Sequence, residues 1–156
     1  MGRGLWFVRS LDIVVEGNVT ERKPHVVVVE MPFSFPFRDK TVRTRIKGYD
    51  IHEMTGTKMR AMFQRKRGRD LFDLYWALTK SARTVKAPAI IESFQHYMKQ
   101  QGTKAGRTEF IGILDDHLAD RGFRSDMMPL LRNGIDYDPQ VAGIYIKTNL
   151  LNLLPE

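Results

Sequence analysis

The chain has 156 residues, of which 42% are hydrophobic and 28% are charged, a composition that suits a folded domain and argues against general disorder. It contains no cysteine, which excludes disulfides and thiolate metal sites. No apolar stretch reaches the ~18 to 20 residues of a membrane span, and none has the form of a signal peptide. A cytoplasmic protein without a membrane partner is therefore expected. The net charge of +7 favours partners that carry phosphate, although it is also compatible with a basic protein that is merely soluble.

Three segments of the first 48 residues are predicted to form strands. Residues 5–16 alternate apolar and polar side chains with period two, and Gly17 and Asn18 indicate a turn after them. A second strand is expected at residues 25–31, and because residues 26–29 are all valine it is either covered on both faces or paired deep in a sheet. The stretch from Pro32 to Pro36 is expected to interrupt regular structure, since each proline lacks an N–H donor. Residues 41–47 are a third, weaker candidate with one basic face.

From residue 50 onward the apolar spacing becomes helical. Helices are predicted at residues 50–66, 69–80 and 88–100, from residue 108 onward, briefly at 126–132, and from residue 139 to the end of the chain. Asp50 with Glu53 resembles a capping box, Gly68 is expected to end or kink the first helix, and Asp138 is expected to cap the last one. Strands followed by helices predict an α+β fold, in which a small, mostly antiparallel sheet (1–48) precedes a helical C-terminal bundle (49–156).

Lys58 occupies an unusual position for a lysine. It follows Met54 by four residues and precedes Met62 by four, so it falls in the middle of the apolar stripe of its predicted helix. A lysine in that position either extends its stem along the edge of the core or reaches a buried anion. Residues 58–69 also hold six of the 25 lysines and arginines of the chain, so basic charge is concentrated around this lysine.

Asp70 and Asp73 are the acidic counterparts of this basic segment. They are three residues apart, so one helix presents both carboxylates on one face. Either they form local ion pairs with the neighbouring arginines or are stabilised by the dipole at the helix N-terminus, or an antiparallel pairing of the two helices brings them to Lys58, Arg65 and Arg69. Cations and carboxylates that converge in this way suit a triphosphate and its Mg²⁺.

The histidines and aromatic residues are given structural interpretations. No two of the four histidines have a spacing typical of metal ligands, so surface or core roles are favoured for all of them: His25, His52, His96 and His117. Five aromatic residues of the predicted helices fall at helical spacing, which favours core packing over base stacking: Phe72, Tyr75, Trp76, Phe94 and Tyr97.

Residues 57–75 resemble a long family signature. The pattern Lys-x-x-Ala-x-x-x-Arg, at Lys58, Ala61 and Arg65, is followed by Arg-Asp-x-x-Asp-Leu-Tyr, which runs from Arg69 to Tyr75. This combination is similar to the core motif of the AbiEii/AbiGii nucleotidyltransferase toxins. The resemblance is strong over residues 50–78 and looser elsewhere, where Glu16 and the two residues after it resemble the Glu-Ile-Asn strand of the family, with glycine in place of isoleucine.

The resemblance implies a polymerase-β-like core, an NTP and Mg²⁺ as ligands, transfer of a nucleotidyl group to an acceptor such as tRNA, and a cognate antitoxin protein as a partner. By match to the motifs, Lys58, Asp70 and Glu16 would be the catalytic residues. Lys58, Arg65 and Arg69 would bind the nucleotide, and Glu16 and Asp70 would hold the metal.

One family motif has no counterpart in the sequence. The family has an Asp-x-Asp pair, the principal metal ligands, after a Gly-Ser or Gly-Gly turn, whereas the only such spacing here, Asp136 and Asp138, is better interpreted as a turn and a helix cap. Two-metal chemistry requires carboxylates on both metals, so we expect an incomplete catalytic site. The chain would then be a fragment or a shortened gene product, and it would bind NTP weakly or not at all on its own.

Two alternatives to an enzyme remain open. A noncatalytic basic module would use Arg43, Arg45, Lys47 and the cluster at residues 58–69 to hold tRNA or another acidic partner. A structural remnant would pair an exposed sheet edge with another chain, for example as a homodimer.

Overall fold

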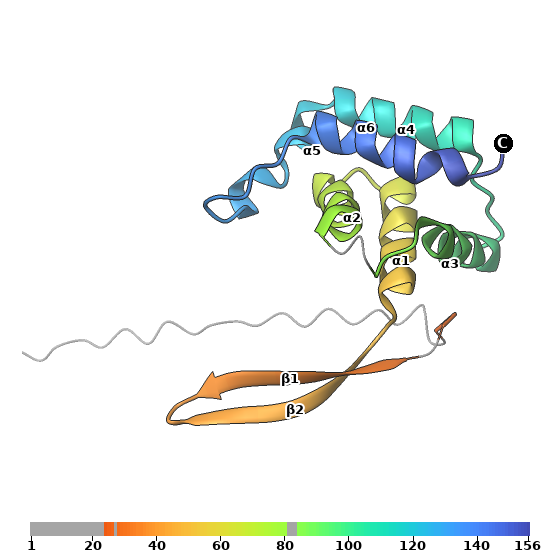
Figure 1. The fold of residues 1–156 in the computed structure, drawn as a ribbon. Coiled ribbons are helices and arrows are strands. Elements are labelled where there is room, and N and C mark those ends of the chain that lie inside the picture. Colours follow the sequence, from red (N-terminus) through yellow and green to blue (C-terminus); the bar gives the residue numbers. More distant parts are fainter. Residues whose placement is uncertain (1–23, 27, 81–83) are drawn as a thin grey trace, which may run out of the picture.

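The computed structural model describes residues 24–26, 28–80 and 84–156, so the predicted strand at residues 5–16, the turn after it and the candidate residue Glu16 lie outside the described residues. The described part of the chain is a β-hairpin followed by six α-helices and two short 3₁₀ turns. The helices pack into one body, and the hairpin extends away from it (Figure 1). The predicted α+β class, with antiparallel strands before helices, is confirmed.

The hairpin consists of β1 (Val29–Phe37) and β2 (Lys40–Gly48), joined by Arg38 and Asp39. The strands are antiparallel, and the pairs run from Val29 with Gly48 to Phe37 with Lys40. Arg38 has a φ of 55°, which places a positive φ at the first central position of a two-residue turn, as the turns that match strand twist require. The third predicted strand is therefore confirmed, with one more residue at each end.

The prediction that Pro32 to Pro36 interrupts regular structure is wrong, since both prolines lie inside β1. In a hairpin with a two-residue turn, the flanking residues Phe37 and Lys40 form a hydrogen-bonded pair, so the N–H of Phe37 points toward β2. The residue before Phe37, and every second residue back from it along β1, directs its backbone nitrogen away from β2. Pro32 and Pro36 fall at these outward positions, where a missing N–H removes no bond between the strands.

The second predicted strand is also corrected. It begins only at Val29, and the valines before it are not covered on both faces, because Val26 and Val28 are 39% and 40% exposed. A run of valines is typical of a buried strand only where other layers cover it, and these two residues lie at the base of the hairpin, outside its ladder.

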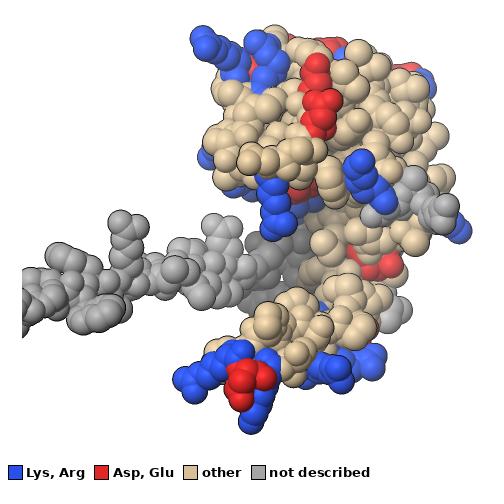
Figure 2. All heavy atoms as spheres, turned by 60° about the vertical axis from the view of Figure 1, so that its left-hand side comes forward, with Lys and Arg blue, Asp and Glu red and all other residues tan. Residues whose placement is uncertain are grey.

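The two faces of the hairpin differ in character. Alternate residues place six large apolar side chains on one face, and all six remain at least 37% exposed: Met31, Phe33, Phe35, Phe37, Val42 and Ile46. The opposite face carries Arg43, Arg45 and Lys47, and Arg45 pairs with Glu30 at 3.0 Å. Lys and Arg side chains also surround the tip of the hairpin, at the bottom of Figure 2.

The helices of the described part are α1 (Ile51–Gln64), α2 (Gly68–Lys80), α3 (Ala87–Gln100), α4 (Arg107–Ala119), α5 (Arg121–Ser125) and α6 (Pro139–Asn149), with 3₁₀ turns η1 (Met128–Leu130) and η2 (Leu151–Leu153). Asp50 caps α1 by accepting from the backbone N–H of His52 at 2.8 Å, and Asp138 caps α6 in the same way through Gln140 at 2.7 Å. Gly68 does not end the first helix but begins the second. The brief helix predicted at residues 126–132 is only η1, and α5, which the sequence did not indicate, precedes it.

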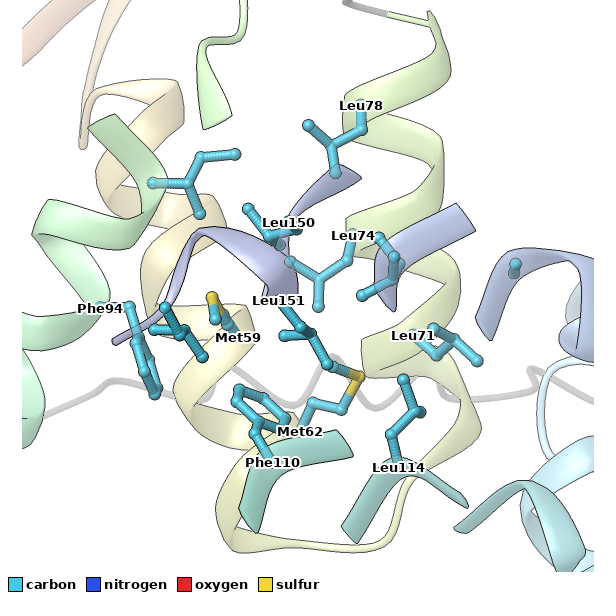
Figure 3. Close-up of a cluster of buried hydrophobic side chains, with 14 of the residues drawn as sticks. Met59, Met62, Leu71, Leu74, Leu78, Phe94, Phe110, Leu114, Leu150 and Leu151 are labelled. Atoms are coloured by element: carbon cyan, nitrogen blue, oxygen red, sulfur yellow. The ribbon is translucent and has the colours of Figure 1, made fainter. Parts of the chain in front are cut away.

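The helices meet in one hydrophobic core (Figure 3). Its centre combines side chains from four helices and η2 that are all completely buried: Met59, Met62, Leu71, Leu74, Phe94, Phe110, Leu114 and Leu151. Gly56 permits the close approach of α1 to α3, because a Cβ at this position would lie only 2.7 Å from the Cβ of Ser93. No helix in the described ranges is both long and apolar enough to cross a membrane.

A buried carboxylate ties the base of the hairpin to the helices. Glu53 is fully buried and accepts hydrogen bonds from the backbone N–H groups of His25 (2.6 Å) and Val26 (3.0 Å) and from the hydroxyl of Tyr97. The capping-box prediction is therefore only half right. Asp50 caps α1, whereas Glu53 accepts hydrogen bonds from backbone N–H groups that lie 27 to 28 residues earlier in the chain.

Acid is expected to weaken the folded state at this junction. The ring of His25 stacks on that of His96 with centroids 3.9 Å apart. Burial lowers the pKa of His96, and the charge of His25 lowers it further. Because the folded-state pKa lies below the unfolded value of about 6.5, this contribution to stability is complete above that pH and is lost as the pH falls through the folded-state value.

The measurement is the thermal unfolding midpoint at about pH 7.5 and about pH 5.5, for the wild type and His96→Gln. Acidification should lower the thermal unfolding midpoint of the wild type more than that of the His96→Gln variant. Burial also lowers the pKa of His117, but His117 is present in both proteins and cancels in the comparison. Equal losses in the two proteins would show that the stacked pair does not contribute.

Candidate functional site

Lys58 on α1 lies beside two carboxylates of α2. Its Nζ atom is 2.8 Å from Oδ2 of Asp73 and 3.6 Å from Oδ1 of Asp70. The side chain of Asp70 is completely buried, whereas those of Lys58 and Asp73 are 41% and 42% exposed. The helix pair thus joins one solvent-accessible cation to one buried and one accessible carboxylate, all from the segment that the sequence singles out.

Arg65, the residue directly after α1, holds Asp70 through both of its carboxylate oxygens. Its Nε donates to Oδ2 of Asp70 at 2.8 Å and its Nη2 donates to Oδ1 at 2.9 Å, a two-point contact of planar groups. The ion-pair alternative left open by the sequence is therefore present for Asp70 and Arg65. Because both oxygens of Asp70 are engaged, this carboxylate fixes the two cations relative to each other.

The link between the helices sets this geometry. Arg65 leaves α1 in an extended conformation, with φ −144° and ψ 152°, and α2 begins three residues later. Gly68 packs directly against the backbone carbonyl of Phe123, which fixes the start of α2 on α5. The backbone N–H of Arg69 donates to Asp126 at 3.3 Å, while its side chain is exposed, so among the described residues Arg65 and Lys58 are the cations that contact Asp70.

A recess of about 290 Å³ opens next to Lys58, between α1 and α2. Its walls come from both helices: Ile51, Met54, Thr55 and Lys58 on α1, and Asp73, Trp76 and Ala77 on α2. Met54 is 46% exposed, so the apolar stripe predicted for α1 is not buried along its whole length. Lys58 accordingly lies at the edge of the core and lines the recess, instead of crossing the core interior.

Trp76 corrects the interpretation of the aromatic residues. Phe94 and Tyr97 are buried, and Phe72 and Tyr75 pack against the core, as predicted, but Trp76 is 38% exposed and lines the recess. The sequence did contain a signal. Trp76 follows Asp73 by three residues, which places the two side chains on the same face of α2.

The described residues do not by themselves form a Mg²⁺ site. Among them, no group of three or more His, Asp or Glu side chains is arranged to hold a metal. Asp70 has both oxygens on Arg65, and Asp73 is paired with Lys58. The other predicted metal ligand, Glu16, lies outside the described residues, so the assignment of both residues to a metal stays a prediction.

A comparison with known protein families finds a match. The family model described as "Nucleotidyl transferase AbiEii toxin, Type IV TA system" matches residues 8–143. Searches of curated proteins and of solved structures find no match. The matched range includes the hairpin, the site around Lys58 and all helices up to the middle of α6. The chain belongs to the AbiEii nucleotidyl transferase toxin family of type IV toxin–antitoxin systems.

Proposed function

We propose that this chain handles a nucleoside triphosphate at Lys58, as part of a toxin that transfers a nucleotidyl group to an acceptor such as tRNA and is opposed by a cognate antitoxin. The observation that carries the proposal is the position of the Lys58 ammonium group, at the rim of a recess and held by two carboxylates. A lysine fixed in this way is a preorganised donor for a phosphate oxygen.

Lys58 keeps donors for this task. An ammonium group has three, and the 3.6 Å separation from Asp70 is longer than a hydrogen bond, so Asp73 at 2.8 Å is the closer acceptor. We assign Asp70 a positioning role, because it is buried and contacts both Lys58 and Arg65. Nucleotide contacts by Arg65 and Arg69 and the binding of Mg²⁺ are parts of the proposal that follow from the family.

Lys58→Ala is expected to weaken NTP binding by roughly 10-fold to 100-fold, since a hydrogen bond to a charged group contributes about 1.5–3 kcal/mol. Isothermal titration of the 156-residue chain with each NTP measures the effect. The matched control is Lys66→Ala, because Lys66 belongs to the same basic segment, is 45% exposed and likewise pairs with one aspartate, Asp120, at 3.0 Å. Equal losses in the two variants would mean that only the overall charge attracts the nucleotide.

The transfer step is tested with labelled NTP and tRNA. Incorporation of label that requires Lys58 supports the transferase. A second candidate function, a noncatalytic RNA-binding module, is favoured by the exposed basic residues of β2 and the tip of the hairpin (Figure 2). Salt-dependent retention of tRNA that Lys58→Ala leaves unchanged, without incorporation, would favour that function over transfer.

A further inference from the structure

We propose that the recess beside Lys58 receives the nucleobase of the bound nucleotide and that Trp76 is its main contact. The inference rests on the proposed function, because it places the rest of the ligand next to the phosphate that Lys58 would hold. It adds a second contact point on the ligand, and with it an expected order of preference among nucleotides.

The recess has the size and the walls of a site for a flat apolar group. Its volume of about 290 Å³ is at the lower end for ligand pockets, which suits one base and not a whole nucleotide. The walls are mostly apolar, from Ile51, Met54, Trp76 and Ala77, and Lys58 and Asp73 are the charged residues among them. An anion with an apolar end therefore complements the recess better than an uncharged apolar ligand does.

Trp76 is held in place and yet accessible. Phe72, one helical turn earlier, stacks on it with ring centroids 5.4 Å apart and an interplanar angle of 27°. The ammonium group of Lys80, one turn later, lies 5.4 Å from its ring centroid. These neighbours restrict the indole, but 38% of Trp76 stays exposed, whereas Leu74 and Leu78 of the same helix are buried. A large aromatic surface that is fixed and half open is a preformed contact for another ring.

The polar side chains of the recess already have partners. The hydroxyl of Thr55, which is 3% exposed, donates to the backbone carbonyl of Ile51, and the carboxylate of Asp73 is paired with Lys58. Apart from the indole N–H of Trp76 and the donors of Lys58, which the proposed function assigns to the phosphates, the lining side chains thus offer little to read the hydrogen-bonding edge of a base. Selection should follow the area of the ring, so ATP and GTP should bind similarly and both more tightly than CTP and UTP.

Tryptophan fluorescence gives a direct readout of contact. The chain has two tryptophans, so Trp6→Phe leaves Trp76 as the single reporter. ATP and GTP should quench its fluorescence, whereas inorganic tripolyphosphate should bind without quenching and should displace the nucleotide in competition. Quenching by tripolyphosphate equal to that by ATP would overturn the inference, because the signal would then come from the phosphates.

Two variants separate the base from the phosphates. Trp76→Ala should weaken ATP binding by roughly 10-fold and leave the affinity for tripolyphosphate unchanged, while Trp76→Phe should keep most of the ATP affinity. Ala77→Leu fills the recess from the same helix without removing a charged group, so it should have the same selective effect even if Trp76→Ala disturbs the fold. Ile144→Ala, at a 64% exposed apolar residue of α6, is the matched control and should change neither affinity.

The possible failures are distinguishable. If tripolyphosphate binds through Lys58 but ATP binds no better, and the Trp76 and Ala77 variants change nothing, the inference fails and the proposed phosphate site stands. If neither ligand binds, or if Lys58→Ala affects neither, the proposed function fails together with the inference.

Discussion

Gly68→Ala is expected to destabilise the protein by about 3 kcal/mol, at the upper end of the usual cost of overpacking. Gly68 is buried at the first position of α2, and a Cβ there would collide with the backbone carbonyl oxygen of Phe123 and lie 3.2 Å from the Cβ of Asp126. Backbone atoms cannot move aside as a flexible side chain can, so α2 would have to separate from α5.

Urea unfolding of the variant measures this cost. Gly112→Ala is the matched control, because Gly112 lies inside α4 and a Cβ there would meet no heavy atom within 4 Å apart from the adjoining helix backbone. That substitution should stabilise the protein by up to about 1 kcal/mol, because alanine favours a helix more than glycine does. A Gly68→Ala protein as stable as the wild type would show that the contact between α2 and α5 is looser than described.

Asp70→Ala is expected to cost about 2 kcal/mol. The carboxylate is completely buried and receives two charged hydrogen bonds from Arg65, with Lys58 3.6 Å away. Removing one partner of such a contact usually costs more, but Lys58 and Arg65 are 41% and 51% exposed and can regain water, which reduces the penalty.

The neighbouring aspartate is the control for this experiment. Asp73→Ala removes a carboxylate that is 42% exposed and has one cationic partner, so its cost should stay below about 1 kcal/mol in the same urea titration. Asp70→Asn keeps the shape of the side chain, so its cost in stability should lie between those of Asp73→Ala and Asp70→Ala. If Asp73→Ala proved the more costly substitution, the site would depend on the exposed ion pair and not on the buried carboxylate.

The parts of the fold that depend on local chemistry were predictable. Asp50 and Asp138 cap helices, and Pro88 lies in the first turn of α3, because each acts on backbone groups within a few residues. The prolines of β1 misled the prediction, since their effect depends on which edge of the strand faces a partner, a property of the paired structure. Glu53 has the spacing of a cap, but its partners come from a distant segment.

The candidate site was likewise predictable where it depends on spacing along a helix, and not where it depends on distant elements. Helical offsets suffice to indicate that Lys58 and the two aspartates face each other once α1 and α2 pack together. They do not indicate whether Trp76 is covered, because that depends on the elements beside α2 and not on the spacing within it. The recess formed by Trp76 with Met54 therefore appears only in the folded chain.

The outward-facing prolines of β1 have a consequence for the addition of strands from other molecules to the hairpin. Within the described residues no further strand pairs with the hairpin, and phenylalanines are exposed beside its edge, a combination that usually invites strands to add. A strand that approached β1 would find no N–H donor at Pro32 or Pro36, and one that approached β2 would meet Arg43, Arg45 and Lys47, whose charges repel a second copy. The two prolines that the sequence predicts to interrupt the strand thus make its outer edge a poorer template for a further strand.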